Sequence, residues 1–347
     1  MKKTHSDQYK FVILTLGFFL AFFGSFWIGR YDVAPVQTLR ILIDRLVRAV
    51  SFGHLSLEQT WQAREQAVVV NVRLPRVGAA ALVGAALSTA GCAYQGMFRN
   101  PMVSPDLLGA STGAGFGAAL ALLLGLGYMA VTVSSFCFGL LAVLLAYLIS
   151  RASKIQPALS MVLAGVMISS LFTSGTSFVK LVADTDQQLP TITYWLMGAL
   201  TSVKLRDLHF AFGPILVGLV PLWLLRWRIN LLTLSEAEAR SMGVDTGKMR
   251  LIVVLCATLM TAGSVAISGM IGWVGLVIPH FCRMMFGQDY RKLIPASSLL
   301  GASFLMVVDN LARTITTSEI PLGILTSFVG APVFLYLILS GGTQREH

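Results

Sequence analysis

Charged residues are scarce in this sequence, and the shortage limits the fold before any motif is considered. Of 347 residues, 12% are charged and 55% are hydrophobic, and the mean hydropathy is +0.75. Soluble domains carry roughly a quarter charged residues, which cover the surface that faces water. A charge that faces lipid instead costs about 2.5–3.5 kcal/mol on insertion scales. The composition therefore excludes an ordinary water-soluble fold and predicts a single membrane domain over residues 1–347.

The residue patterns of catalysis and metal binding are missing as well. The four cysteines lie in apolar segments without CxxC spacing or a neighbouring His cluster, so we interpret Cys92, Cys137, Cys256 and Cys282 as small core residues. The five histidines are scattered, and there is no HExxH, GxSxG or GxxxxGK[ST] motif. The sequence predicts no catalytic residue, no metal site and no ATP hydrolysis by this chain.

The net charge of +10 raises the question of a nucleic-acid partner. The Lys and Arg residues stand between long apolar stretches, without the interleaved aromatic residues that a single-strand binder needs. We therefore expect no nucleic acid and take the lipid bilayer as the partner of most of the chain.

Long apolar runs give the number of membrane crossings, because a bilayer core about 30 Å thick needs about 20 helical residues. Two runs, 107–150 and 251–282, are too long for one crossing, and residues 125–128 and 268–275 offer breaks. The first run is too long for a signal peptide and lacks an A-x-A cleavage site, so we expect it to be retained. The ten predicted helices are 11–29, 77–98, 107–125, 128–150, 155–179, 208–227, 250–268, 272–286, 293–312 and 320–340.

The basic residues predict the orientation, because Lys and Arg accumulate on the cytoplasmic side of membrane proteins. With the N-terminus inside, fifteen of the 26 basic residues lie on the cytoplasmic side, and seven of the others lie in one long outer segment, residues 30–76. Both termini are therefore predicted to be cytoplasmic.

Two acids lie close to the apolar runs, where ionisable residues are typical of ion-coupled carriers. Asp106 follows Pro105 at a predicted helix start, where a carboxylate caps free N–H groups. Asp309 precedes Arg313 by four residues, the spacing of an ion pair on a helix surface. His209 and Asp309 are near helix ends, so an ion-coupled secondary carrier is the weaker alternative. A membrane-embedded enzyme is weaker still.

Two short segments have helical features but cannot cross. Residues 235–243 begin with a cap and two acids and stop at a Gly, which predicts a brief helix in a cytoplasmic loop within the region 232–246. Residues 186–197 carry aromatic side chains suited to an interface, and they predict a re-entrant or surface helix at the outer mouth of a pathway.

Several strings then occur in a defined order. They are Arg-Leu-Pro-Arg (73–76), Gln-Gly-Met-Phe-Arg-Asn-Pro (95–101), Leu-Gly-Ala-Ser-Thr-Gly-Ala-Gly (108–115), Tyr-Trp-Leu-Met-Gly (194–198), the stretch 238–243, Gly-Trp-Val-Gly-Leu-Val-Ile-Pro-His (272–280), Asp-Asn-Leu-Ala-Arg (309–313) and Glu-Ile-Pro-Leu-Gly (319–323). Together they resemble the FecCD-type permeases of bacterial ABC importers, over residues 73 to 340.

This resemblance implies an all-α integral membrane fold with ten transmembrane helices, like the vitamin B12 permease of a type II ABC importer. It also implies a homodimer in the bacterial cytoplasmic membrane, two cytoplasmic ATPase subunits and a periplasmic substrate-binding protein. ATP and magnesium would be bound by the ATPase subunits, so this chain itself would need no cofactor.

The resemblance also assigns roles to residues of this sequence. Contacts with the ATPase would come from Glu236, Glu238, Arg240 and Gly243. The binding protein would dock on Arg73, Arg76 and Arg313, since guanidinium groups pair bidentately with carboxylates. The cytoplasmic gate of the pathway would lie at Asn100, Met102, Ala158 and Leu159. This sequence departs from the family at Met102, where Leu is usual, and at Ala158 and Leu159, where the B12 permease has small polar residues.

The expected cargo is an iron chelate, either a siderophore or haem. Cobalamin and oxyanions such as molybdate use the same fold and remain open, because specificity in this family rests mainly on the binding protein.

Overall fold

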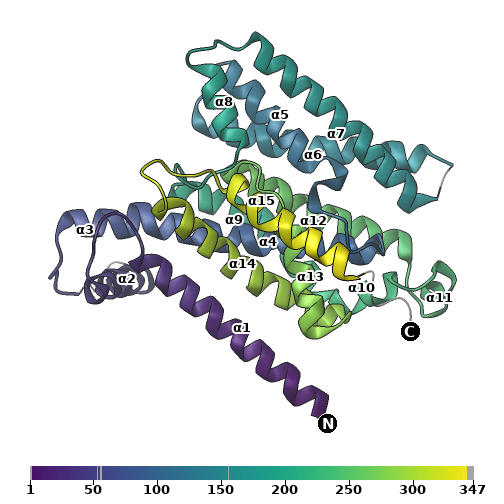
Figure 1. Ribbon diagram of the computed structural model, residues 1–347, viewed down its shortest axis with the longest axis horizontal. Helices are drawn as coiled ribbons and strands as arrows, with labels where there is room; N and C mark the ends of the chain where they lie inside the picture. The colour runs from purple at the N-terminus through teal and green to yellow at the C-terminus, as the bar shows by residue number, and fades with distance from the viewer. Residues whose placement is uncertain (1, 53, 55–56, 155, 342–347) are drawn as a thin grey trace.

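The computed structural model describes residues 2–52, 54, 57–154 and 156–341, which contain helices and no strand (Figure 1). In chain order the elements are α1 (Lys2–Trp27), α2 (Pro35–Val50), α3 (Ala63–Ala67), the π-helical η1 (Val68–Arg73), α4 (Leu74–Met97), the 3₁₀ turn η2 (Pro105–Leu108), α5 (Ala110–Leu123), α6 (Tyr128–Ala152), α7 (Pro157–Val182), α8 (Gln188–Leu196), α9 (Leu205–Leu224), α10 (Arg226–Leu232), α11 (Glu236–Ser241), α12 (Thr246–Ser268), α13 (Val274–Phe286), α14 (Tyr290–Thr314) and α15 (Leu322–Gly341).

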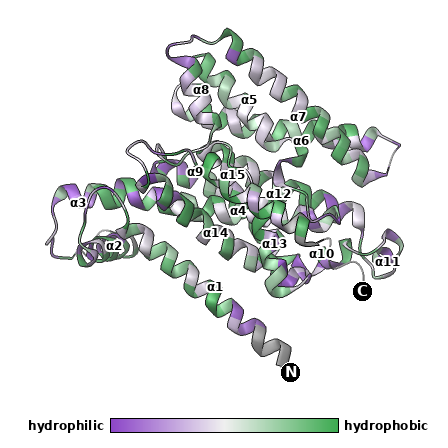
Figure 2. Cartoon of the chain, viewed as in Figure 1, coloured by the Kyte–Doolittle hydropathy of each residue, from purple (hydrophilic) through white to green (hydrophobic). Residues whose placement is uncertain are grey.

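Seven of the described helices are long and apolar enough to cross a membrane, namely α1, the continuous helix from α3 to α4, α6, α7, α9, α12 and α14. Three shorter apolar helices, α5, α13 and α15, lie in the ranges of the other three predicted crossings. The all-helical membrane fold predicted from the apolar runs is confirmed, and most of the ribbon is hydrophobic in Figure 2.

The second crossing differs from its prediction. A helix was expected from residue 77, after the last charge, but the helical segment begins at Ala63 and runs without a break to Met97. The arginines at 73 and 76 do not stop the helix because both are buried and bonded inside the protein. Pro75 stands at the start of α4, directly after the wider π-helical turn, which accommodates a residue that cannot donate a backbone hydrogen bond.

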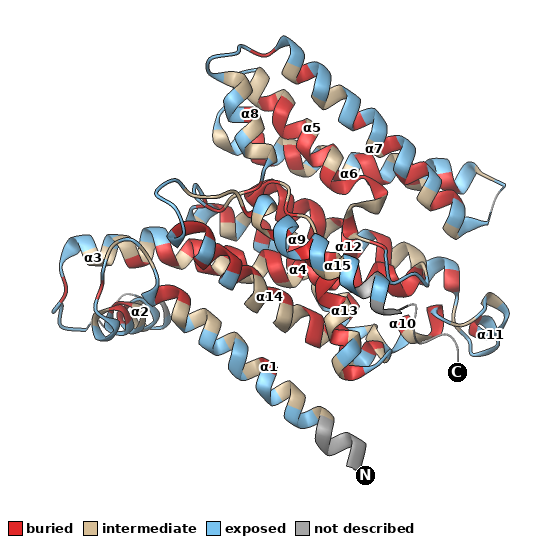
Figure 3. Cartoon of the chain, viewed as in Figure 1, coloured by how far each residue is buried: buried red, intermediate tan, exposed pale blue. Residues whose placement is uncertain are grey.

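The centre of the bundle is formed by α4 and α12, in which 78% of the best membrane window is buried, against 17% for α1. Figure 3 shows this contrast as buried helices inside and exposed faces on α1, α7 and α15. Small residues allow the central helices to approach closely: a Cβ added to Gly91 in α4 would lie 1.9 Å from the carbonyl oxygen of Gly275 in α13. Helices α5 to α8 gather on one side of this centre (Figure 1).

The break expected within residues 268–275 occurs at Gly269. Its φ of +66° favours glycine, and a Cβ there would lie 2.3 Å from the carbonyl oxygen of Trp195, at the end of α8. The short helix predicted in 186–197 is present as α8. Two further helices of the described residues were not anticipated from the sequence: α2, in the long segment between the first two crossings, and α10, which follows α9 directly.

Candidate functional site

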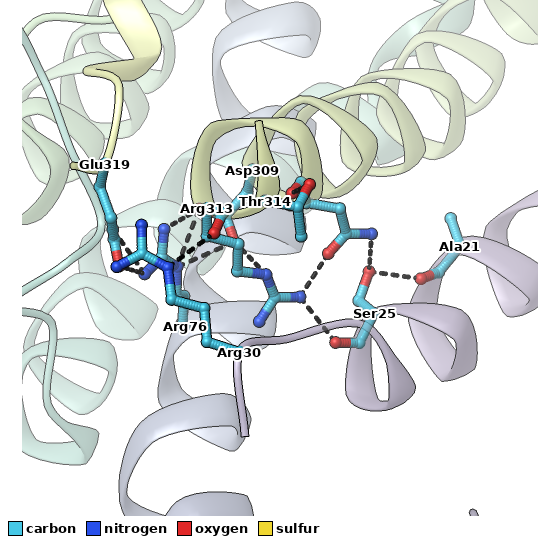
Figure 4. Close-up of polar contacts among 9 residues, drawn as sticks. Ala21, Ser25, Arg30, Arg76, Asp309, Arg313, Thr314 and Glu319 are labelled. Atoms are coloured by element: carbon cyan, nitrogen blue, oxygen red, sulfur yellow. Dashed lines mark hydrogen bonds and ion pairs between the residues drawn. The ribbon is translucent and has the colours of Figure 1, made fainter. Parts of the chain in front are cut away.

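Charged side chains from α4 and α14 meet at one end of the bundle, beside the end of α1 (Figure 4). The Nε of Arg76 donates to both carboxylate oxygens of Asp309, at 2.9 and 3.0 Å. The Nη1 of Arg76 lies 2.8 Å from a carboxylate oxygen of Glu319, in the segment before α15. Arg76 and Asp309 are buried. Two carboxylates therefore surround one guanidinium group and neutralise it in a forked geometry that arginine favours.

Arg313 binds the end of α1. Its Nη2 donates to the backbone carbonyl of Ser25 at 2.7 Å and to the side chain of Asn310, and its Nε lies 3.9 Å from Asp309. Asn310 in turn donates to the hydroxyl of Ser25 at 2.9 Å. The carbonyl of Arg313 accepts from Arg30, in the segment after α1, at 3.1 Å. These hydrogen bonds connect the end of α1 and the segment after it to α14.

Arg73 makes a similar connection from η1. It donates to the backbone carbonyl of Phe26 at 2.5 Å and to that of Tyr31, and so satisfies acceptors that the end of α1 leaves open. The arginine cluster consists of Arg73, Arg76, Arg313, Asp309 and Glu319.

The three arginines that the resemblance assigns to binding-protein docking are almost fully buried in the single chain. Arg73, Arg76 and Arg313 are 2%, 5% and 6% exposed, and their donors bind groups within the chain. The sequence shows that these residues are charged but not that their partners come from distant segments. A binding protein that docked on these three guanidinium groups would have to break internal bonds first. The Asp309–Arg313 pair exists as predicted, but it is buried, and Arg76 is the nearer partner of Asp309.

Asp106 also differs from its predicted role. The residue before η2, Ser104, and the residue before α5, Gly109, cap their helices without a side-chain bond. The Asp106 carboxylate instead accepts a hydrogen bond from the hydroxyl of Ser111, in the first turn of α5. The acid ties η2 to α5 rather than capping a helix.

At the opposite end of the bundle lies the short helix predicted within 235–243, here α11 (Figure 1). The Ser235 hydroxyl accepts from the backbone N–H of Glu238 at 3.3 Å, and the Glu238 carboxylate accepts from the backbone N–H of Ser235 at 2.9 Å. This reciprocal capping box explains why so short a segment is helical. Arg240 is exposed, and Gly243, with a φ of +78°, follows the end of the helix.

The bonds at the start of α11 also fix the charge of Glu238. The hydroxyl of Ser235 and then its backbone N–H donate to the carboxylate and hold the pKa of Glu238 below its ordinary value. The first turn of α11 therefore carries an ionised carboxylate, which complements the positive end of the helix dipole.

A pocket of about 350 Å³ connects α11 with the predicted gate. Its lining includes Ala158 at the start of α7 and Glu236 of α11, whose carboxylate pairs with Arg250 of α12 at 2.7 Å. The structure thus brings together one residue from the predicted gate and one from the predicted ATPase contact, although 78 positions separate them in the printed sequence.

The remaining predicted gate residues lie near this pocket in the chain. The Asn100 side chain accepts from the backbone N–H of Met102 at 2.9 Å and so folds the loop after α4. Met102 is 49% exposed and Leu159 is 51% exposed. Both apolar side chains therefore face outward from the single chain.

Arg99 was not selected from the sequence, yet it joins this loop to the approach to α11. Its Nε donates to the carbonyl of Leu232 at 3.0 Å, and its Nη2 donates to the carbonyl of Leu234. Its φ of +52° is unusual for a residue with a side chain. The only signal in the sequence was its place in the string 95–101, between the last turn of a crossing and Pro101.

One exposed face of α7 carries hydroxyl groups. Ser170, Thr173, Ser174 and Ser177 are all exposed, and their spacing of three and four residues places them on one helical face. The same face continues toward the start of α7 through apolar residues to Leu159. We call these four residues the hydroxyl stripe. An exposed row of hydroxyl groups within a crossing is unfavourable against lipid and favourable against water or another polar surface.

Among the described residues, no group of three or more His, Cys, Asp or Glu side chains could hold a metal ion. The hydroxyl stripe lies in a segment without charge, since the sequence has no charged residue between Lys154 and Lys180. The hydroxyl stripe therefore lacks the carboxylate, imidazole and thiolate ligands that a bare metal cation requires.

Known proteins resemble the chain over most of its length. The molybdate import system permease protein MolB of Haemophilus influenzae is 37% identical over 98% of this chain and 99% of its own. An iron chelatin transport system permease protein of Helicobacter pylori is 41% identical over 78% of this chain and 82% of its own.

A solved structure of a metal-chelate type ABC transporter in an inward-facing conformation superposes with a TM-score of 0.82. It is 37% identical and covers 94% of this chain and 97% of that chain. The model of the FecCD transport family matches residues 16–340, and this chain, a multi-pass membrane permease, belongs to that family.

Proposed function

We propose that this chain is the permease subunit of an ATP-driven importer in a bacterial cytoplasmic membrane, and that its cargo is an iron chelate, a siderophore or haem complex. The observation that carries the proposal is the hydroxyl stripe on α7. Two copies that face each other along this stripe enclose a polar, uncharged pathway, and the apolar side chains of Leu159 and Met102 narrow its α11 end.

The absence of charge along this face favours a chelate over the other cargoes. A bare cation needs carboxylate, imidazole or thiolate ligands, and pores for anions are lined by rings of Lys or Arg. A metal already enclosed in an organic ligand needs neither. Molybdate is the second candidate, because the MolB relative matches nearly the whole length of both chains.

The partners follow from the two ends of the bundle. In this proposal α11 lies in the cytoplasm, where Glu236, Glu238, Arg240 and Gly243 meet one of two ATPase subunits that bind ATP and magnesium. A periplasmic binding protein delivers the chelate at the end that holds the arginine cluster. The excess of basic residues on the α11 side supports this orientation, with both termini cytoplasmic.

Uptake into proteoliposomes tests the cargo. The permease, its ATPase subunit and its binding protein should accumulate a radiolabelled ferric siderophore or haem only when ATP is supplied, and should do so after proton and sodium gradients are collapsed. Uptake of molybdate but not of the chelate would show that the cargo is molybdate. Uptake driven by an ion gradient without ATP would indicate a secondary carrier.

Cysteine labelling tests the pathway. Cys137 is exposed and the other three cysteines are buried, so a C137S variant provides a background for new thiols. S174C should react with a water-soluble thiol reagent in reconstituted membranes. The control F19C, which is also exposed and lies on the outward face of α1, should not react. If both thiols are equally protected from the reagent, the hydroxyl stripe does not line a water-accessible pathway.

A further inference from the structure

The helix α2 has an exposed apolar stripe that the proposed transport function does not use. The stripe consists of Val36, Leu39, Ile43, Leu46 and Val50, which recur every three or four residues and are between 39% and 73% exposed. Their spacing places all five on one face of the helix. An exposed aliphatic face of this length needs an apolar environment that the single chain does not supply.

The opposite face of α2 packs on the protein. Thr38, Ile41 and Asp44 are buried, and the Asp44 carboxylate accepts from the backbone N–H of Leu57 at 2.8 Å and pairs with Arg48 at 2.8 Å. The helix is therefore held in a fixed rotation, and its apolar stripe points away from the bundle.

The position of α2 indicates what lies against the stripe. Figure 1 shows α2 nearly along its own axis, whereas α1 and α14 lie closer to the plane of the picture, so α2 runs across the direction of the crossings. It follows the end of α1, whose Trp27 is 45% exposed, and Trp is typical of the membrane–water interface. Since α1 is the least buried of the long crossings, we expect the surface beside α2 to face lipid.

We propose that α2 lies in the membrane interface at the arginine-cluster end, with its apolar stripe among lipid acyl chains and the exposed Arg45 at the level of the phosphate groups. Amphipathic helices with basic flanks bind membranes in this way. The proposal also accounts for basic residues on a side where the positive-inside rule expects few. It does not depend on the cargo or on the ATPase.

Collision measurements on spin-labelled full-length protein in proteoliposomes test the proposal. In the C137S background, nitroxides at I43C and L46C should collide more with lipid-soluble oxygen than with a water-soluble nickel chelate. A nitroxide at R45C, on the same helix but off the stripe, should show the reverse. Two stripe variants guard against a single misfolded one, and size-exclusion chromatography checks each.

Preferential access of the nickel chelate to I43C and L46C would overturn the proposal. So would low access of both reagents, which would mean that a second copy of the chain covers the stripe. Loss of access only after the binding protein is added would make the stripe a protein docking surface instead.

A second arm tests the role of Arg45. The nitroxide at I43C should shift deeper when phosphatidylglycerol replaces part of the phosphatidylcholine, and R45Q should abolish this shift. An equal depth in both lipid mixtures would overturn the phosphate contact.

Discussion

At the arginine cluster, guanidinium groups are buried and bonded to carboxylates and carbonyls of the same chain, whereas at α11 the guanidinium of Arg240 is exposed to solvent. The first arrangement fixes α1, α4 and α14 relative to one another, because a buried charge cannot leave its partner without a large desolvation cost. The second leaves a short, internally capped helix accessible to another protein. The contrast suggests that one end is built for rigidity and the other for contact.

Removing the buried carboxylate should have the largest effect. D309A leaves Arg76 and Arg313 short of a buried partner, and we expect a loss of about 3–5 kcal/mol of stability. The melting temperature in detergent should fall sharply. The double variant R76L/D309L removes both charges of the nearest pair and should be more stable than D309A. If D309A melts like the unmodified protein, the cluster does not hold this end together.

Loss of the hydrogen bonds by which Arg99 connects the loop after α4 to the segment before α11 should have the second largest effect. R99A removes two hydrogen bonds made by a partly solvent-exposed guanidinium group, and we expect a combined loss of about 1.5–3 kcal/mol. Hydrogen exchange across 232–243 should accelerate, and ATP hydrolysis should continue with less transport for each ATP consumed. R226A is the control, since the hydrogen bond and the ring contact that Arg226 makes in the described part of the chain both go to the nearby Trp223. Equal effects of the two variants would contradict the assignment.

Loss of the cap of α11 should have a smaller effect. S235A removes the hydroxyl that accepts from Glu238, a change that costs about 1 kcal/mol for a typical N-cap. Hydrogen exchange of residues 236–241 should rise severalfold, and the ATPase subunit should bind more weakly. S241A tests specificity, because the Ser241 hydroxyl donates to a carbonyl and caps no helix start. If S241A changes hydrogen exchange and ATPase binding as much as S235A does, the effect does not come from the N-cap.

The smallest effect should be a dependence of α11 on pH. The pKa of Glu238 is lower in the folded helix than its ordinary value of about 4.3. The stabilisation from the ionised carboxylate is therefore complete above that ordinary value and is lost as the pH falls through the lowered folded value. Exchange of residues 236–241, corrected for intrinsic rates, should rise on acidification, and E238Q should flatten this change.

The local features of the fold could be predicted from the sequence, because they depend on residues close together in the chain. The apolar runs located the crossings, the breaks at 125–128 and 268–275 follow from local glycines, and the cap of α11 follows from Ser235 and Glu238. The helix α2 does not stand out as a charge-free run of crossing length, because its arginines interrupt the apolar residues. Its period of three to four residues was the signal that could have revealed it.

The environment of the arginines could not be predicted in the same way. Arg76 finds Asp309 and Glu319 more than 230 positions away, and Arg99 finds the carbonyls of Leu232 and Leu234. Backbone carbonyls carry no sequence signal, and a single sequence gives no information on which distant residues pair. Charge alone therefore favoured the surface for residues that the fold buries.

Hydrogen exchange of the permease with and without its ATPase subunit tests the contrast between the two ends most directly. The account predicts protection of residues 235–243 when the ATPase binds, with unchanged exchange in the helix segments that carry Arg73, Arg76 and Arg313. Unchanged exchange in 235–243, in a complex that demonstrably forms, would contradict it.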